Sequence, residues 1–593
     1  MVKISKSSIN TIMFGISLSF PERILSSVWA RKNETKMMVC DLFQERDRQL
    51  IYSIPICQNG LEDEWMWGGD HQGIYMVLKC FVELVVEING KKNKKKGHVI
   101  LAKGETKSDR SNPERSMEQS MLWIAVTVIV FLLGWSMKLL DRTSSKQQQQ
   151  QQLPPGPPKI PLIGNLHQLN KGGELLHVVL AKMAQEYGTI MTVWFGGLQP
   201  SIVVSDYDLV WKVLVTKASD FSARKLPDLT RIISANFQTL ATCDVGQHWH
   251  SLRRGLHSSA LNPQTISDQA QLQESDIADL ISSLEHEASL NNGLVHPLPK
   301  LRKLVIRLLA RFCFGPDQFP NDEVFVQGMD CAVEDFIKQT GHTSLVHLFA
   351  ITKYIPGLWR PYKEAESLKQ RGLSDDVVIL NLFELFSLAI DSTANAITWA
   401  LAFMIHNREV QEKVFEQVIM KHKLGERRRG NVVMSVEEVR DMEYVHAVVK
   451  ETVRMRPILP VAPQRAERDS ELGGVKVREG TPVVMNLYAV LRDERVWREP
   501  NRFMPERFLG SDVGGDNYLE AMERSFVSFG VGRRICPGME LAKLQVALTL
   551  ANLVKSFEWG SAVEGQLPDL NEEFRTFVLA MKTPLVARIV PRH

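Results

Sequence analysis

One cysteine near the C-terminal end of the chain stands in a sequence context that suits metal chemistry. Cys536 lies in the segment SFVSFGVGRRICPGMELAK, Ser525–Lys543, just before a good helix. A zinc site needs several Cys or His ligands, and this segment holds no second one. A catalytic thiol needs a base, which only a distant His would supply. A cysteine of the core would not need so many glycines before it.

The residues around Cys536 favour a haem-thiolate site over these alternatives. Gly530, Gly532 and Gly538 allow tight turns in which backbone amides approach the sulfur atom. A thiolate ligand donates electron density to a haem iron and so favours cleavage of the O–O bond. Arg534 carries the planar guanidinium that suits a haem propionate.

A five-position pattern in this segment is similar to a known family. The pattern F-x-x-G-x-R-x-C-x-G, formed by Phe529, Gly532, Arg534, Cys536 and Gly538, resembles the haem-binding loop of the cytochromes P450. With average residue usage, it arises by chance in on the order of one chain in ten thousand. The resemblance implies haem b as cofactor, with the cysteine as axial ligand of the iron and the other four residues as haem-binding neighbours.

Other motifs follow in the order that this family has. WHSLR, with Trp249 and Arg253, looks like the helix whose side chains reach a haem propionate. KETVR places Glu451 and Arg454 three residues apart on one helical face, where they can pair, and resembles the E-x-x-R helix. FMPERF then supplies Arg507 as the third member of a structural triad. Because breaking a buried triad of charges is costly, it is expected to fix one loop arrangement.

A long apolar segment, LSDDVVILNLFELFSLAIDSTANAITWALAFMIHN, predicts a helix buried through the middle of a large domain. Ser374 is its plausible N-cap. The segment contains a polar cluster, Asp391, Ser392 and Thr393, where packing alone favours none. An alternative to a catalytic role is that such hydroxyls bond to carbonyls of their own helix.

The resemblance assigns catalytic roles to this cluster. Ala389 stands where the family has glycine, Asp391 stands at the acid, and Ser392 stands at the threonine that activates oxygen, with Thr393 beside it. Serine keeps a hydroxyl that can relay protons. It lacks the methyl group that restricts the threonine rotamer, so the direction of its hydroxyl group is expected to be less fixed.

The central segment, together with RMRPILPVAP, NLYAVLRDERVW and FVLAMKTPLVARI, is similar to one clade of plant microsomal cytochromes P450. That clade, which includes canadine, stylopine and cheilanthifoline synthases, closes methylenedioxy bridges on benzylisoquinoline alkaloids and related lignans. The resemblance implies a small aromatic substrate with an ortho-hydroxy-methoxy ring. It also implies dioxygen as oxidant and electrons from NADPH through a membrane-bound NADPH–cytochrome P450 reductase. Two other interpretations stay open: a plain aromatic hydroxylase, or an O-demethylase.

The substrate pocket is expected to use the segments that usually contact substrate in this family: 226–237, 388–389, 458–461 and 576–578. Most of these residues are apolar, which suits a flat aromatic molecule, although core packing would look the same. The candidate wall residues are Leu388, Ala389, Leu459, Val461 and Phe577.

The start of the chain predicts a membrane anchor. Met121–Met137 carries no charge and is too long for a signal peptide, so residues 117–142 are predicted to be a transmembrane helix. Basic residues after it place the following body in the cytosol, at the endoplasmic reticulum membrane. A Gln-rich and Pro-rich hinge, 143–165, comes next. Its glutamine run is expected to be a low-complexity tether, and the prolines around Gly156 are expected to be stiff and extended.

The remaining composition bounds the interpretation. A net charge of +3 over 593 residues gives no indication of nucleic-acid binding. Seven cysteines without a CxxC pair make a disulfide framework unlikely. Residues 1–116, with a basic run at Lys91–Lys96, are expected to be an upstream gene-model extension without a function of their own.

Residues 166–593 are expected to form the catalytic domain, mainly α with small β-sheets in a cytochrome P450 fold. Helical periodicity dominates this part, and β-type runs such as TIMTVWFG and SIVVSD lie near its start. The segment before the central helix is shorter than the family pattern. An inactive product of a defective gene model is therefore an alternative of a different class.

Overall fold

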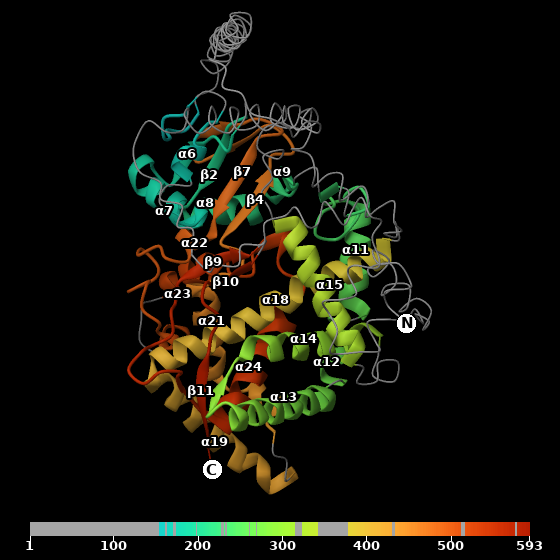
Figure 1. Ribbon diagram of the computed structural model, residues 1–593. Coiled ribbons are helices and arrows are strands. Elements are labelled where there is room, and N and C mark those ends of the chain that lie inside the picture. The colour runs from blue at the N-terminus through green and yellow to red at the C-terminus, as the bar shows by residue number, and fades with distance from the viewer. Residues whose placement is uncertain are drawn as a thin grey trace, which may run out of the picture. The chain divides into compact units, whose positions relative to one another are not determined.

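Helices make up most of the body of the protein, in agreement with the periodicity of its sequence (Figure 1). The computed structural model describes residues 153–592 except 161–162, 170–172, 197–198, 227–229, 232–233, 260, 269, 315–322, 342–376, 430–432, 511–515 and 576–577. The predicted anchor, the N-terminal extension, Ser374 and Phe577 lie outside the described residues.

The longer helices are α7 Leu176–Tyr187, α11 Gln247–Ser259, α13 Ala270–Leu290, α14 Pro297–Phe314, α15 Glu323–Gly341, α18 Val377–His406, α19 Arg408–Arg429, α21 Glu443–Met455, α23 Asp516–Ser525 and α24 Met539–Ser556. The shorter ones are α6 Leu166–Leu169, α8 Tyr207–Trp211, α9 Ala218–Phe221, α12 Pro263–Asp268, α20 Val436–Arg440 and α22 Leu487–Val490. A π-helix, η3, spans Lys212–Thr216, and 3₁₀ turns occur at η5 Pro505–Phe508 and η6 Gly532–Arg534.

Small sheets complete the fold, so the expected class, mainly α with small β-sheets, is confirmed. The largest sheet has the order β1 (Ile190–Val193), β2 (Ser201–Val204), β7 (Pro482–Asn486), β4 (Val461–Arg465), with only the β2–β7 pair parallel. The others are β3 (Leu294–Val295), β11 (Ala587–Pro591) and β8 (Phe557–Ser561), the hairpin of β9 (Glu572–Arg575) and β10 (Val578–Met581), and the hairpin of β5 (Ser470–Leu472) and β6 (Val475–Val477).

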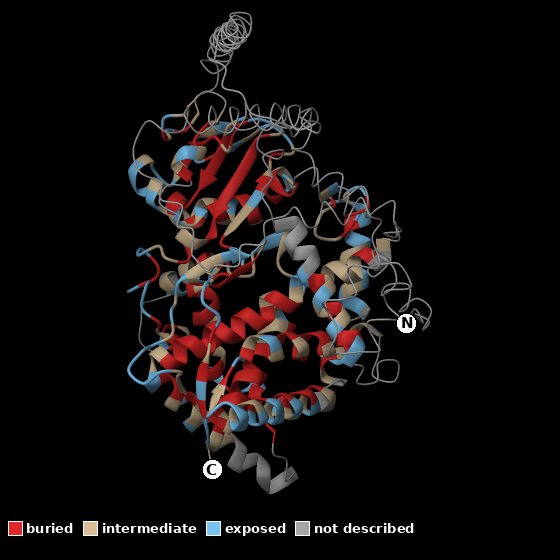
Figure 2. Ribbon diagram, viewed as in Figure 1, coloured by how far each residue is buried: buried red, intermediate tan, exposed pale blue. Residues whose placement is uncertain are grey.

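The central helix α18 is buried, as its apolar composition predicts (Figure 2). In the described part of the chain it contains the one stretch, Leu380–His406, whose length and composition would suit a membrane span. However, 83% of its apolar window is buried inside the protein, which identifies it as a core helix.

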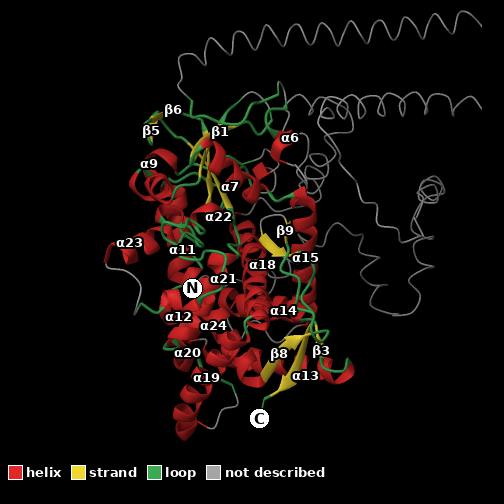
Figure 3. Cartoon of the chain, turned by 90° about the vertical axis from the view of Figure 1, so that its left-hand side faces the viewer, coloured by secondary structure: helices red, strands yellow, loops and turns green. Residues whose placement is uncertain are grey.

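The largest hydrophobic cluster surrounds α18. Side chains of α13, α14, α19, α21 and α24 contribute to it, and Trp399 and Phe403 of α18 lie at its centre. Phe403 stacks on Phe503 with ring centroids 4.6 Å apart. Burial of each such aromatic side chain stabilises the fold by about 1.5–3 kcal/mol. Figure 3 shows α18 among these helices, with strands β3 and β8 beside α13. The core therefore fixes α18 against α24, the helix that begins just after Cys536.

Candidate active site

The loop before α24 has a shape that only glycine permits at two positions. Gly530 and Gly532 have φ values of 69° and 70°, a region that other residues rarely adopt. A Cβ atom on Gly532 would also lie 2.0 Å from the carbonyl oxygen of Leu214 in the π-helix η3. The turn closes where the N–H of Cys536 donates to the carbonyl oxygen of Phe529 at 2.9 Å. The spacing of the motif thus follows from the backbone of this loop.

The thiol of Cys536 is half-buried at the start of α24. Burial raises its pKa, whereas the backbone N–H of Gly538, bonded to the sulfur, and the charge of Arg253 lower it. These two groups and the positive end of α24 favour the thiolate over the thiol. They would therefore help Cys536 to act as a thiolate ligand of a metal ion.

The donor set around this thiol suits a metal that brings its own ligands. In the described ranges, no three His, Cys, Asp or Glu side chains cluster closely enough to hold a bare metal ion. A porphyrin already supplies four nitrogen ligands to its iron, so a single protein ligand is enough, and a cysteine thiolate is one of the ligands that haem proteins use. The residues present therefore fit haem.

Trp249 and Arg253 of α11 lie beside the cysteine loop, and their contact with a haem propionate stays a prediction. Arg253 donates from Nη1 to the carbonyl oxygen of Ile535 at 2.7 Å. Its guanidinium lies 5.7 Å from the ring centre of the buried Trp249, and that of Arg534 lies 5.8 Å from the same ring. Burial, and then repulsion by Arg224, lower the pKa of Arg534 to about 10. Cationic groups therefore gather on one side of the loop.

The sequence analysis missed two arginines in this region. Arg224 donates from Nη1 to the carbonyl oxygen of Ala241 at 2.5 Å, and burial lowers its pKa. Arg465 of β4 reaches Asp244 at 3.4 Å, while its buried Nε has no hydrogen-bond partner among the described residues. The only local indication of a role for Arg465 is its position at the end of the segment RMRPILPVAPQR.

Arg224, Arg253, Arg465 and Arg534 all lie close to the cysteine loop or to the 234–243 segment beside it, with the carboxylates of Asp244, Glu384 and Glu467 among them. Each guanidinium is a planar fork that matches carboxylates. The two propionate groups of a haem are acids of the kind that such a cluster accommodates, which is a second feature of this structure that fits the cofactor.

The polar cluster of α18 separates into different environments. Asp391 is buried and forms an ion pair with Arg302 of α14, which also donates from Nε to Asp330 of α15 at 2.7 Å. Arg302 therefore links α14 to α18 and to α15, through contacts that the sequence did not indicate. Thr393 is buried.

Ser392 behaves as the structural alternative predicts, because its hydroxyl donates to the carbonyl oxygen of Ala389 in its own helix. At 3.3 Å this bond is long, and Ser392 is only half-buried. Because a hydrogen bond of this length is weak, the hydroxyl can exchange it for a bond to another partner at a small cost in free energy. The hydroxyl thus combines a local bond with an accessible position.

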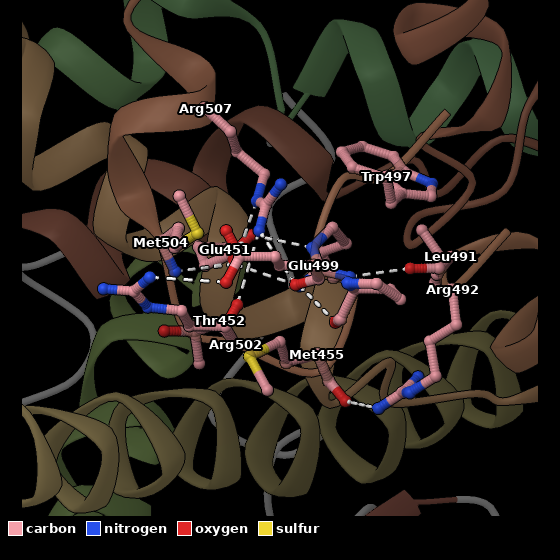
Figure 4. A network of polar contacts seen from close by, with 12 residues as sticks. Glu451, Thr452, Met455, Leu491, Arg492, Trp497, Glu499, Arg502, Met504 and Arg507 are labelled. Atoms are coloured by element: carbon pink, nitrogen blue, oxygen red, sulfur yellow. Dashed lines mark hydrogen bonds and ion pairs between the residues drawn. The ribbon is translucent and has the colours of Figure 1, made fainter. Parts of the chain in front are cut away.

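Glu451, Arg454 and Arg507 form a fully buried network (Figure 4). Arg454 Nε donates to Glu451 Oε2 at 2.7 Å, and Arg507 Nε donates to Glu451 Oε1 at 3.1 Å. The backbone N–H of Met504 adds a bond of 2.9 Å to the same carboxylate. Arg454 also donates to the carbonyl oxygens of Leu491 and Pro500, at 2.7 and 2.8 Å. The network joins α21 to the loops that follow it.

The candidate wall residues fall into two groups. Leu388 and Leu459 are 44% and 40% exposed, which is unusual for large apolar side chains beside a core and leaves surface for a ligand to cover. Ala389 and Val461 pack against core clusters. Ile458, at the start of the segment 458–461, lies beside β10, because the N–H of Leu579 donates to its carbonyl oxygen at 3.0 Å.

The fold and the cysteine loop together define a haem-thiolate protein, and comparison with known proteins agrees. The cytochrome P450 family model matches residues 154–371 and 362–587. The chain therefore belongs to the cytochrome P450 family, whose cofactor is haem with a cysteine thiolate ligand. The two matches overlap at residues 362–371. These residues belong to the segment before the central helix, which is shorter than the family pattern.

Curated relatives in plants cover most of the chain. Cheilanthifoline synthase of Argemone mexicana is 40% identical over 500 residues, which include 79% of this chain and 99% of the relative. (S)-canadine synthase of Coptis japonica is 41% identical over 505 residues, 80% of this chain and 100% of the relative. Pluviatolide synthase of Podophyllum peltatum is 42% identical over 504 residues, 80% of this chain and 99% of the relative.

Proposed function

We propose that this protein closes a methylenedioxy bridge on the ortho-hydroxy-methoxy ring of a plant alkaloid or lignan. The observation that carries the proposal is the similarity to cheilanthifoline, (S)-canadine and pluviatolide synthases over nearly their whole length. In this reaction the substrate loses two hydrogen atoms as the methyl carbon bonds to the neighbouring phenol oxygen. Dioxygen, NADPH and one proton are consumed, and two water molecules form.

The residues of the site are proposed to have different roles in this reaction. When bound, the haem supplies the oxidation of the methoxy carbon. Cys536 would ligate its iron, with Phe529, Gly532 and Gly538 shaping the loop. Trp249, Arg253 and Arg534 would hold its propionates, and Arg465 would join them.

The remaining task of the protein is positioning, because the methyl group rather than a ring carbon must face the metal. Leu388 and Leu459 offer exposed apolar surface for that purpose. Ala389, Val461 and Phe577 are proposed as further wall residues. Ser392 is proposed as the proton donor of the site. Asp391 and Thr393, which flank Ser392, are proposed to act with it, and the ion pair of Asp391 with Arg302 supports a role in holding this part of α18 in place.

Replacing Ser392 with alanine should lower ring closure by at least about 100-fold, the lower end of the range expected when a positioned proton-transfer group is lost. The haem content should stay unchanged, and more hydrogen peroxide should form per NADPH consumed. Peroxide and product are measured together in reconstituted enzyme. Thr398→Val is the control, because its hydroxyl on the same helix bonds the carbonyl oxygen of Ala394 at 2.8 Å. Unchanged coupling in Ser392→Ala would remove the proposed role.

The reaction itself is tested with a substrate panel. Microsomes that contain the protein and its reductase are given scoulerine, cheilanthifoline, tetrahydrocolumbamine and a lignan with an ortho-hydroxy-methoxy ring. We expect a product that is lighter than its substrate by two hydrogen atoms. A product heavier by one oxygen would identify a hydroxylase, and one lighter by a CH₂ group would identify a demethylase. No product, together with no absorption band for bound carbon monoxide, would identify an inactive chain.

We also propose that residues 117–142 anchor the protein in the endoplasmic reticulum membrane, with the body in the cytosol beside NADPH–cytochrome P450 reductase. The uncharged run in this segment and the basic residues after it support the proposal. Such an anchor would keep the protein and its electron donor in one membrane.

A further inference from the structure

The loop of residues 234–243 has an unfavourable backbone. Ala235, Asn236 and Phe237 have φ values of 47°, 60° and 61°. Asparagine adopts this left-handed region fairly readily, but alanine and phenylalanine do so rarely. Three such residues in succession persist only where surrounding contacts hold them.

Bonds within the segment and to the residues just before it hold each half of the loop. The N–H of Phe237 donates to Ser234 Oγ at 3.1 Å, and the N–H of Gln238 donates to the carbonyl oxygen of Ser234 at 2.9 Å. The hydroxyl of Ser234 donates in turn to the carbonyl oxygen of Thr230. In the second half, the N–H groups of Thr242 and Cys243 donate to the carbonyl oxygen of Thr239 at 3.1 and 2.8 Å. The N–H groups of Leu240 and Ala241, which lie between these residues, have their partners outside the loop.

Two side chains of the central helix α18 supply those partners. The N–H of Leu240 donates to Asn381 Oδ1, and the N–H of Ala241 donates to Glu384 Oε1, both at 2.8 Å. Asn381 is held for this role, because its Nδ2 donates to the carbonyl oxygen of Val377 at 2.6 Å. Residues 381 and 384 are three apart and share one face of the helix.

Charge reinforces this attachment. Arg224 donates to the carbonyl oxygen of Ala241, and the N–H of the same residue donates to Glu384. Ala241 is thus bonded to one cationic and one anionic side chain. Burial raises the pKa of Glu384, while the hydroxyl of Thr239, the N–H of Ala241 and the charge of Arg224 lower it. The carboxylate is therefore partly buried among groups that compensate its desolvation.

The other end of the loop reaches the cysteine loop. Arg534 donates from Nη2 to the carbonyl oxygen of Cys243 at 2.7 Å and from Nε to that of Ser222 at 2.7 Å. Along α18, Glu384 lies one turn before Leu388 and two turns before Ser392, on the same side of the helix. The loop is thus fixed beside the residues that the proposed function needs.

We propose that Asn381 and Glu384 are positioning residues that fasten the 234–243 loop to the central helix and so fix the width of the substrate pocket. This inference deepens the proposed function and rests on it for the identity of the substrate. The loop then acts as a fixed wall that admits flat aromatic molecules in one orientation.

The test uses the full-length haem protein and two ligands of the iron. Imidazole is too small to need the loop, whereas 4-phenylimidazole extends a flat ring toward the pocket wall. In Glu384→Ala we expect the affinity for 4-phenylimidazole to fall about tenfold, as for the loss of a hydrogen bond to a charged group. Imidazole binding and haem content should be unchanged. Glu384→Gln, which keeps an acceptor without the charge, should show an intermediate loss.

Amide hydrogen exchange provides a second readout that needs no ligand. The amides of residues 240 and 241 should exchange at least about tenfold faster in Glu384→Ala, because local opening becomes easier. Asn381→Ala should act in the same way and serves if Glu384→Ala fails to fold. Ser387→Ala is the control, since the hydroxyl of Ser387 donates to the carbonyl oxygen of Glu384 in its own helix and, among the described residues, has no bond to the loop.

The outcomes separate this proposal from the proposed function. Unchanged exchange and unchanged 4-phenylimidazole affinity in both variants would overturn the positioning role, whatever reaction the enzyme performs. Altered values for both would support it even if the substrate panel yielded a hydroxylated product.

Discussion

Replacing Cys536 with serine should abolish the absorption band at about 450 nm that carbon monoxide produces with reduced haem-thiolate iron. A neutral serine hydroxyl does not replace the thiolate as a ligand. Ring closure should fall by at least about a hundredfold, more than the loss of a partner outside the ligand shell would cause. The measurement is a difference spectrum of the reduced protein, with haem quantified separately.

Cys331→Ala is the matched control for this variant. Cys331 is an exposed cysteine on α15, far in the sequence from the cysteine loop, so its loss should leave the spectrum and turnover intact. If Cys536→Ser kept the 450 nm band at wild-type strength, the assignment of the ligand would be wrong. The proposed reaction would then have no basis in this site.

The second large effect is expected at Glu451. Replacing it with glutamine leaves Arg454 and Arg507 buried without a balancing charge, because Glu451 and Arg454 are both 0% exposed. Breaking such a pair should lower the free energy of unfolding by about 3–5 kcal/mol. The midpoint of urea unfolding, followed by circular dichroism and by loss of the 450 nm band, measures this change. Haem incorporation during expression should fall with it.

Arg502→Gln controls for the removal of an ion pair as such. Arg502 pairs with Glu499 at the same three-residue spacing, but both side chains are largely exposed. Removing that pair should change the free energy of unfolding by no more than about 1 kcal/mol. A Glu451→Gln protein with wild-type stability would show that the buried network is not needed to hold the loops after α21.

Much of the fold follows from local pattern. Apolar side chains all round the segment 377–406 predict a buried helix, and the structure has it. Helical spacing predicts that Glu451 and Arg454 can pair, and they do so at 2.7 Å. The predicted roles of Ser392 and the wall residues stay predictions, and Phe577 and the membrane anchor lie beyond the described part of the chain.

Exposure and long-range pairing could not be inferred in the same way. The sequence does not distinguish Leu388 from Ala389 as a wall residue, whereas the structure leaves the first exposed and packs the second. Asp391 carries no local sign of its partner Arg302, which lies on another helix. Arg224, Arg465, Asn381 and Glu384 look like ordinary polar residues in the sequence.

The sequence by itself determined the cysteine loop, because its glycines, its cysteine and the start of α24 are contiguous and their geometry is local. Only the tertiary structure decided which arginines gather beside that loop and which side chains of α18 hold the 234–243 loop. These residues come from segments more than a hundred positions apart. Packing of the whole core brings them within hydrogen-bond distance, and local sequence patterns do not predict such contacts.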